Sequence, residues 1–158
     1  MTGIRVKRAY RAARISDGQR ILVDRVWPRG MARERLRIAE WAKDIAPSSG
    51  LRRWFGHDPA KWDVFRTAYF RELDGKKPET TRILESLRNG PVTLVYGAKN
   101  DEMNNAVALK EYLERQLSAC SASAADVEDN QAVRMSDQET SRNFEGGKDR
   151  GWQNAKLA

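Results

Sequence analysis

Residues 91–97, PVTLVYG, form a continuous apolar run of the kind that becomes a buried β-strand. Residues 21–27, ILVDRVW, make a second run of this type, which Pro28 ends. A turn is predicted just before it at residues 17–19, DGQ, because Gly18 can adopt a positive φ. Continuous apolar runs are typical of parallel strands covered by helices, so the two runs predict an α/β layer fold.

The segments outside these two apolar runs have sequence features that are typical of helices. Asp58 is a predicted N-cap, with Pro59 in the first turn, and Gly75 ends this helix. Its large apolar side chains recur at steps of three and four residues, as one face of a helix requires: Trp62, Phe65, Tyr69 and Leu73. The same signs predict further helices over residues 49–56, 77–90 and 104–117.

Two more strands complete the predicted sheet. Residues 4–10 alternate apolar and polar side chains, and residues 38–47, IAEWAKDIAP, are the candidate for a less visible strand. We expect a small three-layer-type α/β domain over residues 1–117, with a short, mostly parallel sheet and flanking helices. Residues 118–158 are rich in Ser, Ala, Asp, Asn and Gln, so we expect a low-complexity, disordered tail.

The composition narrows the class of protein. The chain of 158 residues is 40% hydrophobic and 32% charged, with no apolar run long enough to span a membrane. The N-terminus lacks the apolar core of a secretory signal, so we expect a cytoplasmic protein. A single cysteine, Cys120, and a single histidine, His57, leave no internal disulfide and no Cys- or His-rich metal cluster, and no cofactor is expected.

The net charge of +7 is unevenly distributed. Residues 1–37 hold 11 Lys and Arg against three acids, whereas residues 118–158 hold five against seven. A basic N-terminal third can attract phosphate groups of nucleic acid or of a small ligand. A well-solvated arginine-rich surface is the alternative.

Polar side chains follow two of the predicted strands, in DRVWPRG (24–30) and in YGAKNDEMNNAV (96–107). Ligands of open α/β sheets bind beyond the carboxyl ends of the strands, and Asn100 or Asp101 can cap the last helix there. The residues predicted to bind a small phosphate, sulfate or carboxylate ligand are Arg25, Arg29, Lys99, Asn100, Asp101, Asn104 and Asn105. In the alternative interpretation, Asp24 forms a structural ion pair with Lys99 or Arg29.

The candidate catalytic residues are His57 and Asp24, although the pattern defines no reaction. An imidazole beside Asp58 could be oriented for proton transfer, but a loop or capping role for His57 is the competing interpretation. The chain has no serine elbow, no phosphate-binding loop and no dinucleotide fingerprint.

Three longer segments carry a family resemblance: RVWPRG (25–30), EWAKDIAPSSGLRRWFGHDPAKW (40–62) and GPVTLVYGAKNDEMNNAVALKEYL (90–113). In this order and spacing they closely resemble the YeaO-like family of short bacterial proteins, domain of unknown function 488, over about residues 3–115. The resemblance implies a compact α/β domain. The chain departs from the family pattern at Met103, where a histidine is frequent, so any chemistry of that histidine would be absent here.

Three classes of function remain open. We favour a protein that binds or acts on a small anionic metabolite through Arg and Lys at the strand ends. The alternative is a nucleic-acid-binding or transcription-related regulatory protein that uses the basic N-terminal third. A third possibility is an interaction protein with residues 118–158 as its partner arm. No membrane association is expected, and the sequence does not define the oligomeric state.

Overall fold

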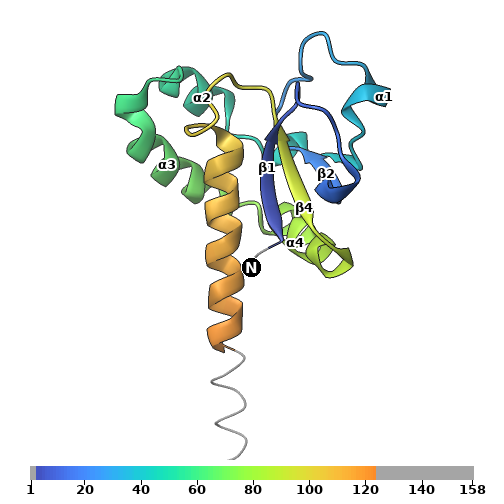
Figure 1. Ribbon diagram of the computed structural model, residues 1–158. Helices are drawn as coiled ribbons and strands as arrows, with labels where there is room; N and C mark the ends of the chain where they lie inside the picture. The colour runs from blue at the N-terminus through green and yellow to red at the C-terminus, as the bar shows by residue number, and fades with distance from the viewer. Residues whose placement is uncertain (1–2, 124–158) are drawn as a thin grey trace, which may run out of the picture. The chain divides into compact units, whose positions relative to one another are not determined.

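Four parallel strands make up the sheet in the computed structural model, which describes residues 3–123 (Figure 1). The strand order is β1-β4-β2-β3, and every neighbouring pair is parallel. The strands are β1 (Ile4–Arg8), β2 (Gln19–Leu22), β3 (Glu40–Trp41) and β4 (Val92–Tyr96). The α/β fold with a short parallel sheet and flanking helices is therefore confirmed.

Strand β4 lies inside the sheet, between β1 and β2. Val92 pairs with Ile4 on one side and with Gln19 on the other. All five residues of β4 are buried, which explains why this stretch is the most continuously apolar of the sequence. The two-residue strand β3 forms the edge beyond β2 and lies within the segment predicted as the less visible strand.

Strand β2 is shorter than the apolar run predicted. It ends at Leu22, although the Val23 amide still donates a hydrogen bond of 3.1 Å to the Val95 carbonyl. The chain then leaves the sheet, because the Asp24 carboxylate bonds the loop after β4 and the Trp27 ring packs edge-on against Trp41, 5.3 Å between centroids. The run that reads as a strand to Trp27 is therefore strand only in its first half.

The predicted helices are present, together with short turns between them. Ser48 caps α2, Gly56 ends it in the left-handed conformation, and Asp58 caps the next turn, as predicted. The α-helices are α1 (Arg33–Leu36), α2 (Ser49–Phe55), α3 (Trp62–Asp74), α4 (Lys77–Ser86) and a final helix over residues 105–123. The 3₁₀ turns are η1 (Ile15–Asp17), η2 (Lys43–Ile45), η3 (Pro59–Lys61) and η4 (Leu87–Asn89).

The C-terminal part of the chain differs in one detail from the sequence prediction. Residues 3–117 lie in one compact unit, and the final helix continues to residue 123, past the predicted end at residue 117. The rest of the predicted disordered tail, from residue 124, lies outside the described residues. Among the helices of residues 3–123, none is both long and apolar enough to cross a membrane.

The two faces of the sheet are covered by different elements (Figure 1). Helices α2, α3, α4 and the final helix pack on one face, where Phe65 and Leu73 of α3 join Leu94 of β4 in the larger hydrophobic core. The other face carries a smaller core, covered by α1 and the loops around it. Its buried members are Ala9, Leu22, Met31, Leu36 and Val95. The chain between β2 and β3 therefore serves as the second cover of the sheet.

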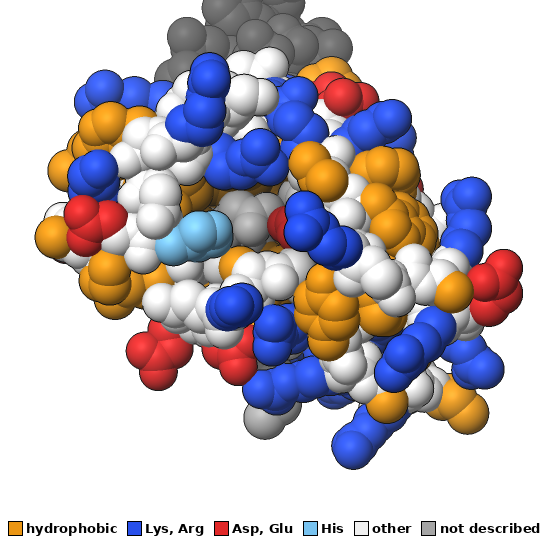
Figure 2. Space-filling model, turned by 90° about the horizontal axis from the view of Figure 1, so that it is seen from above, with side chains coloured by type: hydrophobic (Ala, Val, Ile, Leu, Met, Phe, Trp, Pro, Cys, Tyr) orange, Lys and Arg blue, Asp and Glu red, His pale blue; other side chains and the backbone are white. Residues whose placement is uncertain are grey.

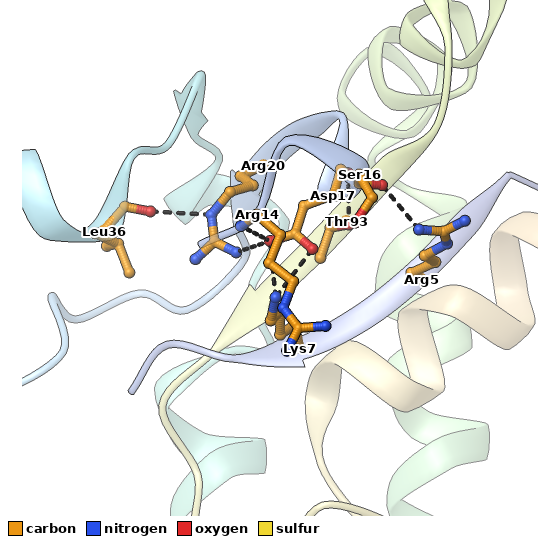
Figure 3. A network of polar contacts seen from close by, with 8 residues as sticks. All are labelled: Arg5, Lys7, Arg14, Ser16, Asp17, Arg20, Leu36 and Thr93. Carbon is orange, nitrogen blue, oxygen red and sulfur yellow. Dashed lines mark hydrogen bonds and ion pairs between the residues drawn. The ribbon is translucent and has the colours of Figure 1, made fainter. Parts of the chain in front are cut away.

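A buried charged network occupies the rest of this second face (Figure 3). The Asp17 carboxylate accepts hydrogen bonds of 2.6 Å from Arg20 and 2.9 Å from Lys7. Arg20 also donates to the Leu36 carbonyl, and the Thr93 hydroxyl donates to the Asp17 carbonyl at 2.7 Å. The network thus connects β1, η1, β2 and β4, whereas the sequence indicated only a turn at Asp17.

Candidate functional site

A pocket of about 150 Å³ opens at the edge of the sheet where β2 and β4 end. Figure 2 looks onto this edge and shows the hollow, with the histidine at its rim and Lys and Arg side chains around it. Its polar lining consists of Asp24, Arg25, Arg52, His57, Asn104 and Asn105. Its apolar lining consists of Val26, Ala46, Pro47, Phe55, Phe65 and Ala98. The pocket therefore combines a charged mouth with a hydrophobic wall.

The carboxylate of Asp24 is fixed by two neighbouring segments. Its Oδ2 accepts a hydrogen bond of 2.7 Å from the Gly97 amide, and its Oδ1 accepts one of 3.0 Å from Asn105 Nδ2. The Asn105 amide group also donates to the Val23 carbonyl at 3.1 Å. Asp24 forms no ion pair with any described residue, so the alternative pairing with Lys99 or Arg29 is not seen.

Burial raises the pKa of Asp24 above its ordinary value. The hydrogen bonds from Gly97 and Asn105 and the electrostatic interactions with Arg52 and His57 act in the opposite direction, but they do not overcome burial. The residues around Asp24 thus remove part of the water from its carboxylate. A desolvated carboxylate is stabilised by an additional hydrogen-bond donor.

Arg25 and Arg52 bring cationic donors to the pocket from two different elements. Arg25 lies in the loop that follows β2, and Arg52 lies in α2. Both side chains are exposed, and neither makes a hydrogen bond or an ion pair with a described residue. Guanidinium groups with free N–H donors are suited to phosphate and carboxylate groups, which they can bind in a two-pronged manner.

His57 lies at the rim because of an unusual turn after α2. Gly56 and His57 both have left-handed backbone conformations, with φ of 53° and 58°. Two such residues in succession reverse the chain after Phe55 and place the imidazole 5.8 Å from the Phe55 ring. No hydrogen bond joins His57 to Asp24 or to any other described residue, so the pair does not form a proton relay in this structure.

The apolar wall comes from α2 and α3. Phe55 and Phe65 stack with 4.2 Å between ring centroids, and both are nearly fully buried. The Phe65 ring also contacts Tyr69, whose hydroxyl donates to the Ile45 carbonyl at 2.7 Å. The wall is therefore part of the hydrophobic core and is held rigidly.

The structure brings together five of the sequence-predicted site residues and leaves four outside the pocket. Asp24, Arg25, His57, Asn104 and Asn105 line it. The predicted ligand residues Arg29, Lys99, Asn100 and Asp101 do not. Neither Arg29 nor Lys99, which were expected to share a hollow, lines this pocket, in which Arg52 is the second arginine beside Arg25.

Asn104, rather than Asn100 or Asp101, caps the final helix. Its Oδ1 accepts from the Val107 amide at 3.0 Å, while Asn100 Oδ1 accepts from Met103 in the preceding turn. Asp101 instead accepts a hydrogen bond of 2.8 Å from Tyr96. Burial, together with this contact, raises the pKa of Tyr96 to about 12.

Sequence reasoning missed Arg52, which is the second cation of the pocket. The sequence signal was present, because Arg52 precedes the predicted helix end at Gly56 by one turn and lies near His57. Nothing local indicates, however, that α2 lies over the carboxyl edge of the sheet. Among the described residues, no three side chains of His, Cys, Asp or Glu are grouped as a metal site would require.

Residues 3–133 match the family model described as the inactive DUF488-N3 subclade. The chain is 42% identical over 110 residues to the uncharacterized protein YeaO of Escherichia coli K12, which covers 70% of this chain and 96% of YeaO. It is 46% identical over 72 residues to the uncharacterized proteins Rv3073c of Mycobacterium tuberculosis and Mb3100c of Mycobacterium bovis, covering 46% of this chain and 61% of each relative. No solved structure matches the chain significantly.

Proposed function

The chain belongs to the YeaO-like DUF488 family, and from this premise we propose that it binds a small anionic ligand in the pocket and does not turn it over. One observation carries the proposal. Arg25 and Arg52 line the same hollow, and their guanidinium groups have no partner among the described residues. Arginines on an exposed surface need no explanation, but two that converge on one pocket provide a site for an anion.

The charge balance of the pocket supports an anionic ligand. Arg25 and Arg52 outweigh the single carboxylate of Asp24, and that carboxylate already accepts hydrogen bonds from Gly97 and Asn105. A hydrogen bond to a charged group contributes about 1.5–3 kcal/mol. Each arginine can therefore change the affinity for an anion by about tenfold or more.

Two observations support binding without turnover: the residues that line the pocket and the description of the matched family model. The description of the matched family model names an inactive subclade. In this chain, His57 and Asp24 line the pocket without a hydrogen bond between them. Proton transfer by an imidazole is most effective when a partner orients the ring, and His57 has no hydrogen-bond partner among the described residues.

The test is isothermal titration of the full-length protein with inorganic phosphate, ribose 5-phosphate and a series of small carboxylates. Arg25→Gln and Arg52→Gln should each weaken binding of the anions that bind by at least about tenfold. Arg88→Gln is the matched control, because it removes the same charge from η4, just before the opposite end of β4. Equal affinity in all three variants, or no binding by any anion, would refute the proposal.

Nucleic-acid binding is the second candidate, and the exposed arginines of the N-terminal third favour it. Four further arginines of the basic N-terminal third are exposed and have no side-chain partner among the described residues: Arg29, Arg33, Arg35 and Arg37. Figure 2 shows Lys and Arg side chains spread over this face. A nucleic-acid complex would weaken steeply with salt, with a log–log slope near the number of phosphates contacted, whereas a pocket ligand would be far less sensitive.

A further inference from the structure

The pocket presents different chemistry at its two ends. In the half-buried part of the lining, Asp24 and Asn105 both offer acceptor oxygens. Each carboxylate oxygen of Asp24 accepts one hydrogen bond from the protein and has capacity for another. The Asn105 amide uses its NH₂ group on Val23 and Asp24, so its oxygen is left without a donor among the described residues. The interior is therefore complementary to an N–H donor.

The mouth of the pocket has the opposite character. Arg25 and Arg52 are exposed there and carry only donors. A ligand that satisfies both ends must be anionic at the mouth and must carry N–H groups at the other end, where Asp24 lies.

The rest of the pocket lining is largely apolar. Phe55 and Phe65 line it together with Ala46, Pro47 and Ala98. Rigid aromatic and small apolar side chains are suited to a flat ring, which can pack against them without bending. A flat body with N–H groups at one end and a phosphate at the other describes a nucleotide.

We propose that the pocket binds a nucleoside monophosphate whose base carries an amino group, with the base on Asp24 and the phosphate on Arg25 and Arg52. The inference rests on the proposed function, because it names the anion that the pocket takes. A carboxylate side chain accepts from the amino group of cytosine, adenine or guanine, whereas a base carbonyl would face it with a second negative dipole. Asp24 would thus select the base, and the arginines would supply affinity for any phosphate.

The experiment compares ligands that differ in one group. Isothermal titration of the full-length protein is carried out with CMP and AMP, which carry amino groups, and with UMP and IMP, their counterparts in which a carbonyl takes that place. GMP is compared with IMP, which lacks only its amino group. Ribose 5-phosphate reports the phosphate alone. At least one amino-bearing nucleotide should bind about tenfold or more tightly than its carbonyl counterpart and than ribose 5-phosphate. This comparison uses the unaltered chain, so it does not depend on the folding of any variant.

Two variants test the recognition of the base and the recognition of the phosphate separately. Asp24→Asn should reduce the preference for the amino-bearing base by about tenfold and leave the affinity for ribose 5-phosphate nearly unchanged. Arg52→Gln should weaken every phosphate ligand and keep the preference among bases. Arg88→Gln should alter neither. The pattern of losses, rather than a general loss of binding, identifies the two roles.

The outcomes distinguish this inference from the proposed function. If ribose 5-phosphate binds as tightly as every nucleotide and Arg52→Gln weakens it, the anion site stands and the nucleotide inference is wrong. The inference is also wrong if a zwitterionic amino acid binds more tightly than any nucleotide. If no phosphate compound and no carboxylate binds, both fail.

Titration with a short oligodeoxycytidylate tests whether the pocket binds a free mononucleotide or a nucleotide within a single strand. Tighter binding of the oligomer than of CMP, with a steep salt dependence, would place the base at the end or within a single strand that also contacts the surrounding arginines. Equal or weaker binding of the oligomer would assign the pocket to free mononucleotides. Either result supports the same recognition of base and phosphate.

Discussion

Asp24 and Gly97 are joined across the carboxyl edge of the sheet, where the Gly97 amide donates a hydrogen bond of 2.7 Å to Asp24 Oδ2. This bond connects the loops that follow the neighbouring strands β2 and β4. Asn105, at the start of the final helix, donates to the other oxygen of the same carboxylate. The loop after β4 and the start of the final helix thus both bind the carboxylate of Asp24, which is more than 70 residues away in the sequence, and this explains why the charged end of the second apolar run lies at the pocket.

Replacing Asp24 by alanine should therefore lower stability as well as ligand binding. The Gly97 amide and the Asn105 side chain would lose their acceptor, and an unsatisfied polar group of this kind costs about 1–3 kcal/mol. Urea unfolding of the full chain measures the loss. The matched control is Asp63→Ala, because the Asp63 side chain is 87% exposed and its ion pair with Arg66 is long at 3.6 Å. Equal stability of the two variants would contradict the bridging role.

The parts of the fold that could be predicted are those in which the residues of one helix or strand are enough to identify it. The five buried residues of β4, the serine and aspartate caps and the glycines that end helices are all local features. Strand β3 has only two residues, and its pairing with β2 is set by the chain between them rather than by its composition. Similarly, Asp17 reads as a turn residue because its partners Lys7 and Arg20 lie on two different strands.

The candidate site was predictable only in part, for a related reason. Strand ends identify the loops of the pocket, so Asp24, Arg25 and Asn105 could be found from the sequence. They do not identify which helix lies over the pocket, and Arg52 was therefore missed. Neither do they give the direction of each side chain in the loops, so Lys99 was included although it lies outside.

Gly18→Ala should be strongly destabilising. A Cβ atom at this position would lie 2.1 Å from the Pro91 carbonyl oxygen, which also accepts a hydrogen bond from Gln19 at the start of β2. Since Gly18 has a φ of 65°, backbone strain adds to the clash. Strain alone costs about 1–3 kcal/mol, so we expect a loss of more than about 2 kcal/mol by urea unfolding.

Gly30→Ala separates the clash from the strain. Gly30 has a similar φ of 75°, but a Cβ atom there would meet nothing within 4 Å. We expect this variant to lose only about 1 kcal/mol, the cost of the left-handed conformation. If the two alanine variants were equally stable, the close approach of Gly18 to Pro91 would not contribute to stability.

Asp17→Asn should also lower stability, because it breaks a buried ion pair from one side. Asp17 is 6% exposed and Arg20 is 3% exposed, so the guanidinium would be left buried without a counter-charge. Breaking a buried pair in this way costs about 3–5 kcal/mol. The control is Arg11→Gln, which removes an ion pair with Asp101 that is exposed on both sides and should cost less than about 1 kcal/mol. A similar loss in both variants would show that burial does not strengthen the network.

The same network predicts how stability changes in acid. Burial alone would raise the pKa of Asp17, but hydrogen bonds from the Arg14 amide, Lys7 and Arg20 lower it below its ordinary value of 3.8. The ionised form is therefore favoured in the folded state, and its contribution is fully present above the ordinary value. It is lost as the pH falls through the lowered pKa. Burial raises the pKa of Asp24, so that group contributes in the opposite direction on acidification.

The difference in unfolding free energy between the wild type and Asp17→Asn isolates the contribution of Asp17, because Asp24 is common to both proteins. Urea unfolding at a series of pH values should give a constant difference near neutrality. The difference should shrink progressively once the pH falls below about the ordinary carboxyl value, since protonated Asp17 no longer carries the charge that Lys7 and Arg20 pair with. A difference that grew instead as the pH fell from 7 to the ordinary carboxyl value would mean that the pKa of Asp17 is raised, with burial outweighing its two cationic partners.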